Sequence, residues 1–135
     1  MQNIKVAIIE DNNRYAQHLK RYLCVTERIG EIDIFSSMGD FKKNGNVSKY
    51  DIVLLDINLP DGNGLDLIQF IKNKSPDTEI IILTTYTDEN KLFSALRLGA
   101  SGYITKENTT RYILEGINEI LAGGAIIPPD MAGRF

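Results

Sequence analysis

Short, continuous apolar runs alternate with longer, helix-forming segments along the whole chain. Five runs rich in Val, Ile and Leu lie at residues 4–9, 32–35, 52–55, 80–83 and 103–105. Several of them lack polar residues at alternating positions, which is typical of strands covered on both faces. Each run precedes a predicted helix, and the second of these helices is short and weakly patterned. The predicted helices lie near residues 12–25, 38–45, 65–74, 88–99 and 108–122.

This order predicts an α/β fold of five βα units. Right-handed crossovers place helices on both faces of a parallel sheet, so we expect a doubly wound five-stranded sheet with strand order 2-1-3-4-5. A length of 135 residues suits a single domain. We expect that domain to span residues 1–123, and residues 124–135 to form a tail or the start of a linker.

Composition narrows the function classes. The chain carries 18 acidic residues against 15 Lys and Arg, a formal charge of −3 that argues against a free-standing nucleic-acid binder. No apolar run exceeds four residues, so we expect no membrane span or signal peptide. One Cys and one His exclude a His/Cys zinc site and an internal disulfide, in keeping with the cytoplasm as the expected compartment. We expect His18 on the solvated face of the first helix and Cys24 to pack beside its apolar stripe.

Polar residues follow four of the five predicted strands. Glu10 and Asp11 follow the first strand, Asp56 the third, Thr84 the fourth and Lys106 the fifth. Sites in open parallel sheets lie beyond the carboxyl ends of the strands, where the strand order reverses. In the order 2-1-3-4-5 the first and third strands flank that point. We therefore expect the three acids to converge in one crevice, with Thr84 and Lys106 along its rim.

Three neighbouring carboxylates need a compensating positive charge, because like charges raise one another's pKa. A divalent cation supplies it, and Mg²⁺ prefers such hard oxygen ligands. Lys106 offers a mobile charge for a phosphoryl oxygen or for Asp56 itself. A carboxylate such as Asp56, held near Mg²⁺ before a constrained turn at residues 58–64, can accept a phosphoryl group. Such a transfer depends on positioning and on charge neutralisation.

These residues resemble the receiver domain of bacterial two-component response regulators over residues 4–123. Asp56, followed by Leu59-Pro60 and Gly64, is similar to the family signature around the phosphoacceptor. The run Gly-Ala-Ser-Gly-Tyr at 99–103 is similar to the segment that leads to the family's lysine. The resemblance implies a flavodoxin-like or CheY-like fold.

The resemblance also implies a Mg²⁺-dependent reaction, in which a sensor histidine kinase passes a phosphoryl group from its phosphohistidine to Asp56. The metal ligands would be Asp11, Asp56 and the backbone carbonyl of Asn58, with Glu10 acting through water. Apart from phosphorylating and dephosphorylating itself, such a domain is a signalling module and not an enzyme.

A switch is implied as well. Thr84 and Lys106 would contact the new phosphoryl oxygens. Thr85 is the alternative to Thr84, because a shift of the strand by one residue would exchange the faces on which the two side chains lie. Movement of Thr84 would let Tyr103 turn inward, which would shift a surface formed by the fourth helix, fifth strand and fifth helix.

Many receivers have Pro after the lysine, where this chain has Glu107. Glu107 and residues 122–129 are more similar to the NarL/FixJ (LuxR-type) subfamily. Those proteins continue into a helix-turn-helix DNA-binding domain that regulates transcription. We therefore expect an output domain that is absent here, and a homodimer on phosphorylation. The first and fifth helices are one candidate for the dimer surface, and the fourth helix, fifth strand and fifth helix are another.

Two other classes compete with a signalling switch. A phosphohydrolase of the haloacid-dehalogenase type needs an acid two residues after its nucleophile, where this chain has Asn58. A flavodoxin needs a loop of backbone N–H groups for the flavin phosphate after the first strand. Glu10 and Asp11 would repel that phosphate.

Overall fold

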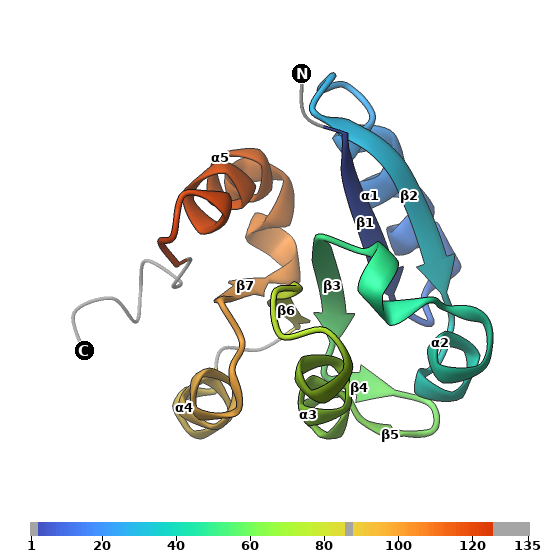
Figure 1. Cartoon of the computed structure of the whole chain (residues 1–135), viewed down its shortest axis with the longest axis vertical. Coiled ribbons are helices and arrows are strands. Elements are labelled where there is room, and N and C mark those ends of the chain that lie inside the picture. The colour runs from blue at the N-terminus through green and yellow to red at the C-terminus, as the bar shows by residue number, and fades with distance from the viewer. Residues whose placement is uncertain (1–2, 86–87, 126–135) are drawn as a thin grey trace.

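A five-stranded parallel sheet lies between two layers of helices in the computed structural model, which describes residues 3–85 and 88–125 (Figure 1). Its strands are β1 Ile4–Ile9, β2 Ile29–Phe35, β3 Ile52–Asp56, β6 Glu79–Thr84 and β7 Gly102–Thr105. The spatial order is β2-β1-β3-β6-β7, and all neighbours are parallel. Counted within this sheet, the order is 2-1-3-4-5, so the predicted fold class is confirmed.

Helices cover both faces of the sheet. α1 (Asn13–Leu23) and α5 (Thr109–Leu121) pack on one face, and α2 (Met38–Asn44), α3 (Leu65–Lys74) and α4 (Glu89–Leu98) pack on the other. Successive strand residues alternate between these two cores, as the pleat requires: Ile8 and Leu54 face α1 and α5, whereas Ile9 and Leu55 face the other three helices. Among the described residues, no helix is long and apolar enough to cross a membrane.

The helix ends follow local capping chemistry. Asn12 directly follows the acidic pair and caps α1 by accepting a hydrogen bond from the N–H of Tyr15. Asp88 caps α4 in the same way, and α4 ends at Gly99, whose φ of +113° is a left-handed conformation that favours glycine. Because α1 starts immediately after β1, its first turn lies beside the acidic residues.

The described part of the chain contains a hairpin and two 3₁₀ turns that the sequence did not predict. Residues expected only as a constrained turn form a small antiparallel hairpin of β4 (Asn58–Leu59) and β5 (Gly62–Asn63). Single turns of 3₁₀ helix, η1 (Val47–Lys49) and η2 (Lys106–Asn108), precede β3 and α5. β2 starts at Ile29 and not at residue 32, because Ile29 pairs with Ile4 across a register shift.

One side-chain expectation was wrong. Cys24 is exposed and does not pack in the core, because it follows the last residue of α1, where the chain leaves the apolar stripe. His18 is exposed, as expected. Of the expected tail, residues 126–135 lie outside the described part of the chain.

Candidate functional site

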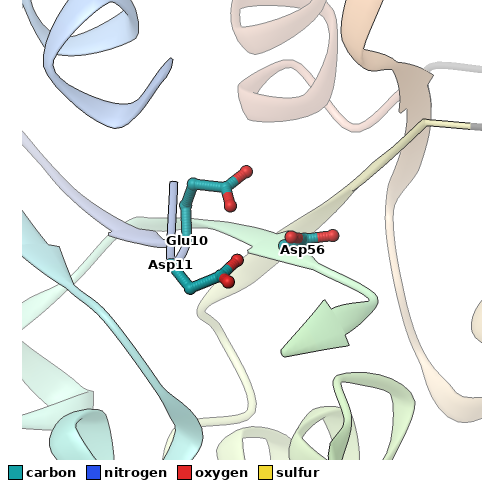
Figure 2. A group of neighbouring side chains, drawn as sticks. All are labelled: Glu10, Asp11 and Asp56. Carbon is teal, nitrogen blue, oxygen red and sulfur yellow. The ribbon is translucent and has the colours of Figure 1, made fainter. Parts of the chain in front are cut away.

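Three carboxylates meet at the carboxyl ends of two neighbouring strands. Glu10 and Asp11 directly follow β1, and Asp56 is the last residue of β3, which pairs with β1. One oxygen from each carboxylate lies within 4.8 Å of the others, and Figure 2 shows Glu10 and Asp11 on the side of β1 that faces Asp56. Glu10 and Asp56 are buried, at 1% and 3% exposure, whereas Asp11 is exposed.

Both oxygens of Asp56 are held by hydrogen bonds. The backbone N–H of Asn58 donates to Oδ1 at 3.1 Å, and Lys106 Nζ donates to Oδ2 at 3.1 Å. Gly64 lets the hairpin fold closely behind Asp56, because a Cβ at this position would lie 2.2 Å from the carbonyl oxygen of Asp56. The N–H of Gly64 donates to the carbonyl of Ile57 at 2.6 Å, which closes the loop.

Lys106 bridges the acidic residues from the end of β7. Its ammonium group forms ion pairs with Glu10 and Asp56, and its side chain is 20% exposed. Burial lowers the pKa of Lys106, but the hydrogen bond to Glu10 and the charges of Asp56 and Glu10 outweigh it, so the pKa is raised overall. This lysine therefore remains a cation at neutral pH.

The site lacks sufficient positive charge for its acids. Burial is the main reason that the pKa of Glu10 rises to about 7, although Lys106 and the N–H of Asn12 both favour the ionised form. Three carboxylates that offer hard oxygen atoms around one ammonium group are a donor set that suits Mg²⁺, which needs only one or two carboxylates and retains several waters. Glu10, Asp11 and Asp56 therefore fit a divalent cation.

The structure also places the two predicted switch residues. Thr84, the last residue of β6, is buried, whereas its rival Thr85 is exposed. The Tyr103 ring is fully buried in the core beneath α3 and α4. Burial raises the pKa of Tyr103, and the nearby Thr84 side chain opposes part of that shift.

Two residues at the site were missed by the sequence reasoning. Tyr15 was not among the predicted site residues, yet its ring centroid lies 5.0 Å from Lys106 Nζ. Thr109, the first residue of α5, accepts a hydrogen bond from the Tyr15 hydroxyl at 2.8 Å. The spacing could have indicated that Tyr15 lies near the acidic residues, because it follows Asp11 by about one helical turn.

Comparison with known proteins identifies relatives over nearly the whole fold. Residues 6–118 match the response regulator receiver domain. The chain is 30% identical over 132 residues to the transcriptional regulatory protein DegU of Brevibacillus brevis, covering 93% of this chain and 53% of that protein. It is 26% identical to the DNA-binding transcriptional activator DevR/DosR of Mycobacterium tuberculosis, covering 92% and 57%. The chain thus spans a little over half the length of these curated relatives.

Solved structures support the same fold. The non-phosphorylated receiver domain of the stress response regulator RcsB from Escherichia coli superposes with a TM-score of 0.86 at 22% identity, covering 94% of this chain and 99% of that one. At this identity the likeness shows the fold alone. The match over residues 6–118, on a parallel sheet of order 2-1-3-4-5, shows that the chain belongs to the response regulator receiver family.

Proposed function

We propose that this receiver works as a phosphorylation-controlled switch, in which Asp56 accepts a phosphoryl group from the phosphohistidine of a sensor histidine kinase. The observation that carries the proposal is the Asp56 carboxylate, which is buried, held at both oxygens and adjacent to two further acids. An Asp56 oxygen attacks phosphorus, the P–N bond of the donor breaks, and its imidazole leaves with the electron pair. The chain itself is a signalling domain whose only chemistry is this phosphorylation and its reversal.

The neighbouring residues have distinct roles in the proposal. Asp11, Asp56 and the backbone carbonyl of Asn58 would hold Mg²⁺, and Glu10 would act through water. When bound, the ion would neutralise charge on the phosphoryl oxygens. Lys106, already 3.1 Å from an Asp56 oxygen, is placed to move onto the phosphoryl group.

Thr84 and Tyr103 would transmit the change. Contact between Thr84 and a phosphoryl oxygen favours the buried position of Tyr103. Because Tyr103 lies on β7 between α4 and α5, a bias in its position shifts the population of the α4–β7–α5 surface.

We also propose the setting of this switch. The receiver spans residues 1–123, and residues 124–135 are a tail or the start of a linker. A helix-turn-helix output domain regulates transcription in the cytoplasm, with a homodimer forming on phosphorylation. DegU and DevR/DosR are named as transcriptional regulators, which supports this setting. The receiver makes no direct contact with nucleic acid or membrane.

Incubation with acetyl phosphate, followed by intact-mass spectrometry, tests the proposal. We expect the wild type to gain one phosphoryl group with Mg²⁺ and none with a chelator. Asp56→Asn should remain unlabelled. Asp77→Asn, the same change at an exposed loop residue, should label like the wild type. Labelling that persists in Asp56→Asn would contradict the assignment of the phosphoacceptor.

A further inference from the structure

The Lys106 ammonium group has a third neighbour besides Glu10 and Asp56. The Tyr15 ring lies 5.0 Å from Nζ, within the range of a cation–π interaction. A lysine side chain has a flexible stem of four carbons and loses conformational entropy when it is held in one place. The carboxylates of Glu10 and Asp56 attract the ammonium group, and the Tyr15 ring restricts the positions that the lysine side chain can take beside them.

Tyr15 is itself fixed to the backbone turn that carries Lys106. Its hydroxyl donates to Thr109 Oγ1 at 2.8 Å, and the Thr109 hydroxyl donates to the carbonyl of Thr105 at 3.1 Å. Thr105 is the last residue of β7 and directly precedes Lys106. Because Thr109 is only 1% exposed, this chain of hydrogen bonds is shielded from competing water.

We infer that Tyr15 is a positioning residue for Lys106. Its ring, anchored through Thr109, holds the ammonium group beside Asp56, where an incoming phosphoryl group would place its oxygens. This inference rests on the proposed function, because it gives Tyr15 a part in phosphoryl transfer. A purely structural Tyr15 would instead join α1 to α5 and leave the reactivity of Asp56 unchanged.

The ring and the hydroxyl can be separated by substitution. Tyr15→Leu removes the ring, whereas Tyr15→Phe keeps it and loses only the anchor. With acetyl phosphate and Mg²⁺, we expect Tyr15→Leu to lower the labelling rate at saturating donor by about three- to tenfold. Tyr15→Phe should restore the rate to within about twofold of wild type, since the ring supplies the cation–π interaction. Tyr22→Leu is the matched control, because Tyr22 lies on the same helix and packs against the same core.

A double-mutant cycle with Lys106→Met isolates the positioning role. If Tyr15 acts through Lys106, Tyr15→Leu should cause no further loss of rate in the Lys106→Met background. An equal loss in both backgrounds would overturn the inference, as would a wild-type rate for Tyr15→Leu. Should Tyr15→Leu fail to fold, Tyr15→Met removes the ring with another apolar side chain, and its effect on the rate should likewise vanish in the Lys106→Met background.

The two proposals fail in different ways. If the wild type takes up no phosphoryl group, or if Asp56→Asn is still labelled, the proposed function falls. If labelling depends on Asp56 but not on the Tyr15 ring, only the positioning role falls.

Discussion

The buried carboxylate of Glu10 gives the fold a pH dependence that can be measured without any phosphodonor. Burial raises its pKa from 4.5 to about 7. An acid whose pKa is higher in the folded state binds protons more tightly there than in the unfolded chain. The free energy of unfolding therefore falls as the pH rises from about 4.5 to about 7, and the loss is complete above that window.

The magnitude follows from the two pKa values. A difference of about 2.5 units between the folded and unfolded states corresponds to about 3 kcal/mol of destabilisation once Glu10 is fully ionised. Between about pH 5 and about pH 8, the wild type should lose about 2 to 3 kcal/mol through this residue. Glu10→Gln cannot ionise, so it should lack this contribution.

Urea unfolding in the presence of a chelator measures the effect at both pH values. The relevant quantity is the change in unfolding free energy with pH, because any packing cost of the glutamine beside Lys106 is the same at both ends and cancels. Glu115→Gln, on the exposed face of α5, is the matched control and should keep the wild-type pH dependence. If the unfolding free energies of Glu10→Gln and of the wild type change by the same amount from about pH 5 to about pH 8, burial does not raise the pKa of Glu10 as argued.

Three other substitutions test the packing around the site, each by urea unfolding against the wild type. Gly64→Ala should destabilise the fold by about 1 to 3 kcal/mol, because its Cβ would overlap the Asp56 carbonyl; an unchanged midpoint would contradict the close approach. Phe41→Ala should cost about 3 to 5 kcal/mol, since the ring is fully buried and packs edge-on against Phe35; a loss below about 1 kcal/mol would count against that packing. Hydrogen bonds from two backbone N–H groups at the start of α2 lower the pKa of Asp61 from its usual value. Asp61→Asn should therefore be less stable than wild type at neutral pH, with a deficit that shrinks as the pH falls through the pKa of Asp61; a deficit independent of pH would contradict this.

The arrangement of the large sheet was predictable because burial leaves a clear trace in the sequence. Runs such as residues 52–55 and 80–83 are apolar at every position, which distinguishes strands covered on both faces from the amphipathic helices between them. Because parallel strands end at the same edge of the sheet, the polar residues that follow these runs lie together at that edge. The approach of Glu10 and Asp11 to Asp56 follows from that topology alone.

The β4–β5 hairpin left no such trace. Each of its strands is two residues long, which is too short for alternation to be seen, and Asn58 and Gly62 are residues that also form turns. Its position is set instead by contacts distant in sequence, such as those of Asp61 with the start of α2. The expected ligand role of the Asn58 carbonyl therefore depends on a segment whose geometry only the folded chain defines.

Tyr15 shows why an apolar stripe can hide a functional residue. Periodicity assigns each helix position to the core or to solvent, but a tyrosine has an apolar ring and a polar hydroxyl, and so suits the boundary between them. Its spacing from Leu19 agrees with a core position, and the residue is indeed half-buried against the α1–α5 core. What periodicity cannot show is where α1 starts. Because Asn12 caps the helix directly after the acidic pair, the first turn brings the Tyr15 ring to the carboxyl edge of the sheet, within 5.0 Å of the lysine that follows β7. The cap, and not the stripe, places Tyr15 at the site.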